Sequence, residues 1–220
     1  SMTLTLLAHP FSSYCQKVLI ALYENGTPFT MRVIGPEDPG ALTELKARWP
    51  FGRFPVLMDD AGSVAESSII IEHLQLHHPG PVRLIPTDPR AALEVRFLDR
   101  LFDNYVHTPM QKIVLDALRE PSQRDPKGVA DARAVLDTAY AWLDRHLEGR
   151  AWAAGEEFGL ADCSAAPALF YADWAHPIDD ALANVRAYRE RLNQRPSFAR
   201  AIEGGRPYRA FFPLGAPDRD

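Results

Sequence analysis

The hydrophobic periodicity of the chain changes near residue 80, and this change limits the possible folds more than any other feature of the sequence. Before it, short runs that alternate like β-strands are interleaved with runs at helical spacing. Prolines and a glycine then interrupt the pattern at Pro79-Gly80-Pro81 and Pro86-Thr87-Asp88-Pro89. Beyond them, every long segment has a helical period. The pattern predicts an α/β domain over residues 1–80, a linker over 81–89 and an all-helical domain over 90–220.

The first domain is expected to follow the order strand, helix, strand, helix, strand, strand, helix. The segments are Thr3–Ala8, Ser12–Asn25, Phe29–Ile34, Ala41–Arg48, Phe54–Met58, Gly62–Ala65 and Glu66–His78. Only the turn-forming Asp59-Asp60-Ala61 separates the last two strands, so they are expected to form a hairpin. This order fits a small mixed sheet flanked by helices, which is the thioredoxin-like arrangement.

Five helices are expected in the second domain. Three of them carry apolar stripes at i, i+3 and i+4 spacing, which begin at Val95, Ala132 and Leu182. The segment Leu160–Trp174 is apolar nearly all round, so we expect it to be the buried central helix. Pro196 suits the first turn of the last helix.

Composition and charge exclude several classes of protein. With 46% hydrophobic and 24% charged residues, the chain can bury a real core, which excludes intrinsic disorder. The formal net charge is −5 and neither half is basic, so no nucleic-acid or membrane partner is expected. No apolar run reaches the ~20 residues of a membrane span, and no signal peptide is expected. Two cysteines, Cys15 and Cys163, indicate a reducing compartment, so we expect a cytoplasmic protein.

Three histidines cluster near the end of the first domain. His73 and His77 stand four residues apart on one face of an expected helix, and His78 follows directly. A zinc site would need a third well-placed ligand, which the sequence alone does not name. We therefore expect no metal and a surface or interface pair of histidines.

The stretch from Ser12 to Val18 lies where the first strand turns into the first helix. Free backbone N–H groups and the positive end of the helix converge there. Ser12 has an obvious role as the helix N-cap. An anion-stabilising site is the alternative, because a thiolate at this point would meet oriented N–H donors and the serine hydroxyl.

Four motifs carry a resemblance to a known family. The sequence SSYCQKV at 12–18 resembles the CPYCxKV signature of glutaredoxins with serine in place of the first cysteine. FGRFPVL at 51–57 resembles a segment around a cis-proline, and AESSII at 65–70 resembles a Glu-Ser glutathione-binding pair. FGLAD at 158–162 resembles the capping box of a central helix. The chain thus resembles the cytosolic glutathione S-transferase superfamily, serine-type and zeta/theta-like, with a bacterial-looking class that is not assigned.

The resemblance implies a role for each glutathione-binding residue. Ser12 would stabilise the glutathione thiolate, and a cis-Pro55 would let Phe54 pair with the cysteinyl backbone in a strand-like way. Glu66 and Ser67 would hold the ammonium and carboxylate of the γ-glutamyl end. Arg53 could meet the glycyl carboxylate, although an exposed arginine without that role is the alternative.

The helical domain would contribute the pocket for an electrophile. The resemblance places Tyr105, Thr108 and Met110 there, with Phe11 opposite, although Tyr105 could instead belong to the core stripe. Gly159 departs from the capping-box pattern, so Asp162 must hold the central helix start alone. Two residues near the site, His9 and Cys15, are expected to be structural, with Cys15 a packed thiol.

The expected function is a glutathione transferase that uses glutathione as co-substrate, without a metal, against a small apolar electrophile in detoxification. A glutathione-dependent isomerase similar to maleylacetoacetate isomerase, a dehalogenase or an ether-cleaving enzyme would use the same chemistry. A non-catalytic binding module and a disulfide oxidoreductase acting through Cys15 are alternatives from other classes. The family also implies a homodimer, formed here through the helices over 66–78 and 91–118.

Overall fold

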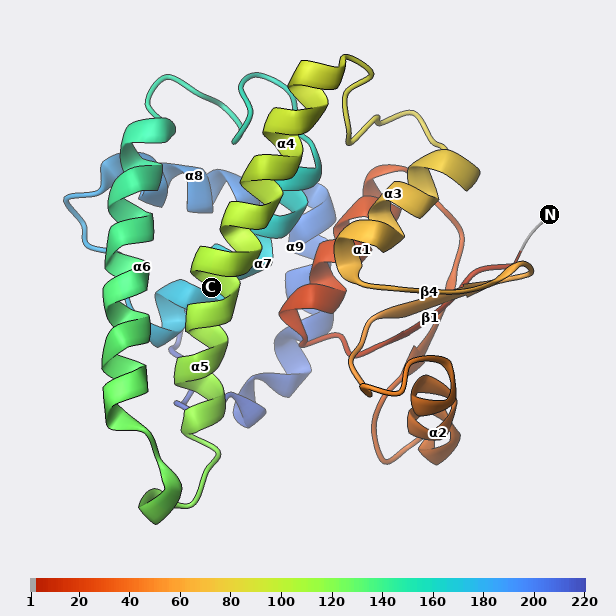
Figure 1. Ribbon diagram of the computed structural model, residues 1–220, viewed down its shortest axis with the longest axis horizontal. Coiled ribbons are helices and arrows are strands. Elements are labelled where there is room, and N and C mark those ends of the chain that lie inside the picture. The colour runs from red at the N-terminus through yellow and green to blue at the C-terminus, as the bar shows by residue number, and fades with distance from the viewer. Residues whose placement is uncertain (1–2) are drawn as a thin grey trace.

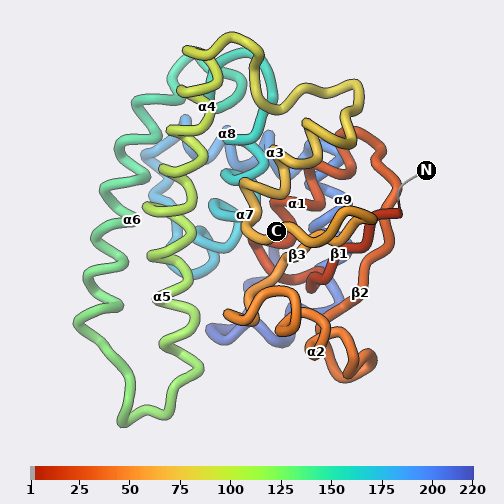
Figure 2. Tube along the Cα trace, turned by 45° about the vertical axis from the view of Figure 1, so that its right-hand side comes forward, coloured from red at the N-terminus to blue at the C-terminus, as the bar shows by residue number. Residues whose placement is uncertain are grey.

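The structure, a computed structural model, describes residues 3–220; the first two residues of the expected α/β domain lie outside the described range. A small sheet with its helices packs beside a larger group of helices (Figures 1 and 2). Among the described residues, none of the helices has the length and apolar character required to cross a bilayer.

The sheet has four strands in the order β2-β1-β3-β4. The strands are β1 (Thr5–Ala8), β2 (Thr30–Val33), β3 (Val56–Asp59) and β4 (Gly62–Ala65). Strand β1 pairs with β2 in parallel and with β3 antiparallel, and β3 and β4 form the expected hairpin. β3 begins two residues later than predicted because Pro55 has no N–H to donate to the ladder. Its first pair partners are Leu7 and Ala65, opposite Val56.

Helices cover both faces of the sheet, and the alternation of strand side chains explains which residues they bury (Figure 1). The helices of this domain are α1 (Ser13–Glu24), α2 (Pro39–Arg48) and α3 (Ser67–His77). Leu6 and Leu57 face the main core together with α1 and α3. Their neighbours Leu7 and Val56 face the opposite side and pack on Leu45 of α2. The thioredoxin-like order of elements is confirmed.

The second domain is entirely helical, as predicted. Its helices are α4 (Pro89–Phe102), α5 (Thr108–Asp116), α6 (Pro126–His146), α7 (Leu160–Ala175), α8 (Ala183–Gln194) and α9 (Pro196–Gly205). Short 3₁₀ turns lie at Pro121–Gln123 and Arg206–Phe211. Every residue of α7 is buried, so the expected central helix is confirmed. The periodicity did not predict the π-helical turn Asp103–His107, which joins α4 to α5 into one long element beside α6 (Figure 1).

The start of α7 depends on the buried Asp162, as the missing capping-box hydroxyl predicted. Its carboxylate accepts hydrogen bonds from the Gly159 N–H at 2.9 Å, the Ala153 N–H at 2.8 Å and the Tyr188 hydroxyl. The structure also explains the glycine. A Cβ on Gly159 would lie 2.8 Å from the carbonyl oxygen of Leu84, so a serine or threonine would require the backbone to shift.

A buried lysine joins the two domains. Lys17 of α1 has no exposed surface, and its ammonium lies 2.7 Å from Asp99 and 2.9 Å from Asp103 in the second domain. It also donates to the Ser68 hydroxyl of α3 at 2.9 Å. Three elements, α1, α3 and the α4–π segment, therefore meet at one charge.

This network predicts a large loss of stability in Lys17→Met. The variant preserves the apolar stem but removes the buried ammonium from Asp99 and Asp103, which keep their contacts with the half-exposed guanidinium of Arg100. The free energy of unfolding should therefore fall by about 3 kcal/mol, the lower end of the range for a broken buried ion pair. Urea denaturation followed by circular dichroism measures the change. Lys127→Met is the matched control, because Lys127 is exposed and pairs with Asp131 on the surface. Equal denaturation midpoints for the Lys17 variant and the wild type would contradict the structural role.

Candidate functional site

A cleft of about 730 Å³ lies between the two domains, at the ends of the elements that Lys17 joins. Its walls come from the first turn of α1, the loop before β3, the start of α3 and the α4–α5 segment. Residues along it include Tyr14, Trp49, Arg53, Phe54, Pro55, Glu66, Ser67, Ser68, Arg100, Asp103, Asn104, Thr108 and Gln111. The cleft thus brings together Arg53, Phe54, Pro55, Glu66 and Ser67, which the sequence singled out.

The loop before β3 presents an unpaired stretch of backbone to the cleft. The Phe54–Pro55 peptide bond is cis, as expected. Within residues 3–220, Phe54 takes part in no turn or loop backbone hydrogen bond, and the strand ladder begins only at Val56. Its N–H and C=O are therefore available to pair with an extended peptide.

The start of α3 forms the opposite wall and suits a carboxylate ligand. Glu66 is its N-cap residue and has φ +74°, a conformation that costs a non-glycine residue on the order of 1–3 kcal/mol. Such strain is concentrated at functional sites. Ser67, the first helical residue, is buried to 6% exposure yet lines the cleft. The free N–H groups of the first turn carry the positive end of the helix dipole and attract anions.

Ser12 is the N-cap of α1. Its Oγ accepts a long hydrogen bond of 3.4 Å from the N–H of Cys15, which agrees with the cap interpretation. Because this bond uses the oxygen as acceptor, the hydroxyl proton remains free to be donated. Ser12 itself does not line the cleft, whereas Tyr14, two positions further along, does.

Tyr14 is a site residue that the sequence analysis missed. Its ring stacks on the ring of His107, with centroids 4.3 Å apart. Burial and the nearby charge of Asp103 raise the pKa of the Tyr14 hydroxyl well above its usual range, so this group remains a neutral hydrogen-bond donor. Its position in the first turn of α1, beside the cap, was the signal that could have identified it.

The residues predicted for an electrophile pocket lie in different parts of the structure and do not form one pocket. Thr108 lines the cleft, while Met110 is 3% exposed in the core. Phe11 packs edge-on against Tyr171, with centroids 5.4 Å apart. Tyr105 belongs neither to the cleft nor to the core: it is 56% exposed and lines an outer groove.

Helical geometry explains the position of Tyr105. Asn104, Thr108 and Gln111 are spaced four and three residues apart, so they share the face that lines the cleft. Tyr105 follows Asn104 directly in the π-helical turn, so its side chain leaves the helix in a different direction from that face. The sequence did not indicate Asn104 and Gln111, because both are polar and lie outside the apolar stripe that predicted this helix.

His9 and Cys15 have structural surroundings. Cys15 has no exposed surface, its sulfur accepts a hydrogen bond from the His9 N–H at 3.4 Å, and burial raises the pKa of the thiol to about 12. His9 Nδ1 accepts from the Phe11 N–H at 3.0 Å, and its ring packs edge-on against Tyr208. This geometry agrees with the expected packed thiol and opposes a role for Cys15 in disulfide exchange.

Burial of both cysteines predicts that the folded protein is unreactive toward thiol reagents. Burial raises the pKa of Cys163 as well as that of Cys15, so neither forms an accessible thiolate at neutral pH. Ellman's reagent at pH 8 should label both thiols in guanidinium chloride and neither, on the same timescale, in the native protein. Rapid native labelling of one thiol would contradict this structure, and comparison of Cys15→Ala with Cys163→Ala would identify which.

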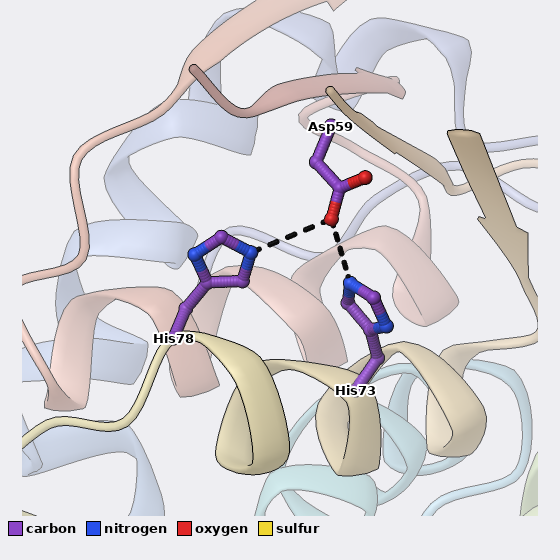
Figure 3. Close-up of side chains that lie close together, drawn as sticks. All are labelled: Asp59, His73 and His78. Atoms are coloured by element: carbon purple, nitrogen blue, oxygen red, sulfur yellow. Dashed lines mark hydrogen bonds and ion pairs between the residues drawn. The ribbon is translucent and has the colours of Figure 1, made fainter. Parts of the chain in front are cut away.

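The histidine cluster lies apart from the cleft, and the structure supplies the ligand that the sequence did not name. Asp59, at the end of β3, lies 2.8 Å from His73 and 3.5 Å from His78 (Figure 3). The hydrogen bond from His73 lowers the pKa of Asp59 to about 2, so the carboxylate is ionised at neutral pH. His77 is exposed, and its ring lies beside that of His73 with centroids 4.8 Å apart, so the expected surface pair is present next to the contact with Asp59.

Taken together, the fold and the cleft define a two-domain protein in which a thioredoxin-like domain presents a peptide-pairing edge and a helix N-terminus to a helical domain. Residues 6–82 match the sequence model of the glutathione S-transferase N-terminal domain, and residues 126–191 match that of the C-terminal domain.

Individual relatives agree with these matches. A glutathione S-transferase of Pseudomonas putida is 32% identical over 160 residues, covering 71% of this chain and 70% of that protein. FtsZ-localized protein A of Caulobacter vibrioides is 30% identical over 210 residues, 88% of each chain. A glutathione S-transferase from Methylobacterium radiotolerans, solved in complex with glutathione sulfonate, has a TM-score of 0.77 at 33% identity and covers 91% of this chain and 94% of that one. The chain belongs to the glutathione S-transferase family.

Proposed function

We propose that this protein is a serine-type glutathione transferase, which activates the thiol of glutathione for attack on an electrophile. The observation that carries the proposal is the cleft in which the unpaired backbone of Phe54 faces the strained Glu66-Ser67 start of α3. A γ-glutamyl tripeptide needs both features, because its backbone pairs with an extended segment and its γ-glutamyl carboxylate needs a helix N-terminus.

The cleft suggests how glutathione is held. The γ-glutamyl carboxylate binds the Ser67 hydroxyl and the first N–H groups of α3, and Glu66 takes the ammonium. The cysteinyl backbone pairs with Phe54, as an added strand pairs with a sheet edge. Arg53, which also lines the cleft, meets the glycyl carboxylate. This orientation directs the thiol toward the start of α1.

The Ser12 hydroxyl then donates a hydrogen bond to the thiolate and stabilises its negative charge. A free thiol with a pKa of about 8.5 is only about 3% ionised at pH 7, and a depression by about 2 units makes the thiolate the major form. The hydroxyl has no adjacent base that would make serine itself a nucleophile. The N–H groups of the first turn of α1 add further stabilisation.

The electrophile binds on the α4–α5 side of the cleft. The residues there, Asn104, Thr108 and Gln111, are polar, in contrast to the apolar lining that the sequence predicted. Tyr14, as a neutral donor, stands between the two subsites. We therefore expect an electrophile with a carbonyl, nitro or ether oxygen beside its apolar part, because an amide or hydroxyl left without a partner there would cost binding energy.

Replacement of Ser12 tests thiol activation. In Ser12→Ala the pKa of the thiol of bound glutathione should rise by about 1 unit or more, because a hydrogen bond to a charged group contributes about 1.5–3 kcal/mol. Turnover at neutral pH should fall roughly 10-fold or more and partly recover in alkaline buffer, with little change in glutathione affinity. Thiolate absorbance as a function of pH measures the shift.

Two neighbouring variants make this test specific. Ser13→Ala is the matched control, since Ser13 is a buried serine one position further along the same helix. Tyr14→Phe removes the rival donor. A pKa shift in Tyr14→Phe but not in Ser12→Ala would reject Ser12 as the activating residue, and superimposable titration curves in all variants would leave Ser12 as a helix cap.

A non-catalytic binding module is the second candidate function. FtsZ-localized protein A, which matches this chain over 88% of both lengths, is named for its location and not for a reaction. Retention on a glutathione resin followed by assays with a panel of electrophiles distinguishes the two. Binding without turnover of any panel member favours the module, and turnover of maleylacetoacetate-type substrates favours the isomerase variant of the same chemistry.

The proposal includes a homodimer. Large apolar side chains are exposed along α3 and α4, among them Ile69, Leu76, Leu93 and Phe97. Phe97 also lines, with Tyr105 and Trp142, an outer groove of about 470 Å³. A cytoplasmic location and a role in detoxification belong to the same proposal, and the two free, buried cysteines fit a reducing compartment.

Sedimentation equilibrium checks the dimer. At micromolar concentration the mass should be about twice the 24.6 kDa of one chain. Phe97→Glu places a charge in the apolar surface and should return the protein to the monomer mass. A wild-type mass near that of one chain would refute the dimer.

A further inference from the structure

The side chains of Asp59, His73 and His78 converge at a point outside the glutathione cleft (Figure 3). The Nε2 atoms of both histidines approach the same carboxylate oxygen, at 2.8 Å from His73 and 3.5 Å from His78. All three candidate ligand atoms lie within 4.8 Å of one another. None of the three residues lines the cleft, so the proposed transferase chemistry does not explain them.

Strand β3 and helix α3 position the side chains of the proposed ligands. Asp59 ends β3, and the N–H of Ala61 in the hairpin turn donates to its other oxygen, Oδ1, at 2.9 Å. This bond fixes the carboxylate and leaves Oδ2 directed at the histidines. His73 projects from the middle of α3.

His78 reaches the cluster because α3 ends just before it. In a continued helix, His73 and His78 would point about 140° apart and could not share a ligand. The helix ends at His77, and His78 has φ −136° as its C-cap residue. Pro79 follows and disfavours helical geometry for His78, which explains the end of the helix from the sequence.

The surroundings resemble those of a metal site more than those of a surface histidine pair. The exposed fractions of the side chains are 4% for Asp59, 11% for His78 and 19% for His73, so the ligand atoms are shielded but can be reached. Two imidazoles and one carboxylate are a common donor set for zinc with a fourth, open position. Zinc–ligand bonds of about 2.0–2.2 Å place neighbouring ligand atoms about 3.3 Å apart, and the two separations between the histidine nitrogens and Asp59 Oδ2, 2.8 and 3.5 Å, lie on either side of this value.

We propose that Asp59, His73 and His78 bind a divalent transition metal ion, with zinc as the preferred ion and water as the fourth ligand. The bound ion links the β3–β4 hairpin to the C-terminal end of α3. The cleft lies at the N-terminal end of α3 and the metal site at its other end. The metal therefore stabilises the domain but does not contact the substrates. The proposal is independent of the transferase activity.

Titration of the chelator-treated, untagged protein with zinc chloride tests the site. Isothermal calorimetry should show one zinc per chain, and zinc should raise the thermal midpoint, because an ion that binds only the folded state stabilises it. Asp59→Asn, His73→Gln and His78→Gln should each weaken zinc binding by at least about 10-fold, since loss of even the outer partners of metal ligands costs 10–100-fold. Cobalt chloride should give visible absorption typical of a tetrahedral site.

His77→Gln is the matched control, because it removes an adjacent histidine that the cluster does not use. The proposal expects unchanged zinc affinity in His77→Gln. Loss of binding in His77→Gln with binding retained in His78→Gln would overturn it in favour of an ordinary helical His73–His77 pair. Absence of one-to-one binding to the wild type at 100 µM zinc, or adventitious binding unaffected by all variants, would also overturn it. The zinc titration of the wild type tests the proposal even if one of the variants fails to fold.

Discussion

The ammonium of Lys17 determines how the two domains meet. It is fully buried, and charge of this kind is tolerated only when it is paired and hydrogen-bonded, which here requires Asp99 and Asp103 from the other domain. A second ion pair, between Arg195 and Glu24, joins α1 to the loop before α9 at 2.7 Å. Together these contacts fix α1 against the helical domain, and the position of the cleft follows from this.

The π-helical turn at Asp103–His107 contributes to the same contact between the two domains. Asp103 begins the turn and accepts a hydrogen bond from Ser164 of the central helix at 2.8 Å, while His107 at its end stacks on Tyr14. One irregular turn thus connects the core of the second domain, the buried lysine and a wall of the cleft. Such turns are rare and are frequently found at functional sites.

Much of the proposed chemistry rests on backbone and helix ends and less on reactive side chains. Phe54 contributes its N–H and C=O, α3 contributes its first N–H groups, and Ser12 contributes one hydroxyl at the start of α1. These groups are set by local geometry: a proline, a strained residue and a cap. For this reason short motifs predicted that Phe54, Pro55, Glu66 and Ser67 come together, and the structure places all four along one cleft.

The sequence by itself determined the order of elements, the buried central helix and the role of Asp162 at its start. Each of these depends on neighbours within a few residues, which periodicity and capping patterns report. Only the tertiary structure decided that Tyr14 faces the cleft, that Tyr105 faces away from it and that Asp59 meets His73 and His78. A sequence pattern describes the faces of one helix or strand, but it does not show which face a distant element covers. The residues that the sequence misplaced are those whose neighbours come from another part of the chain.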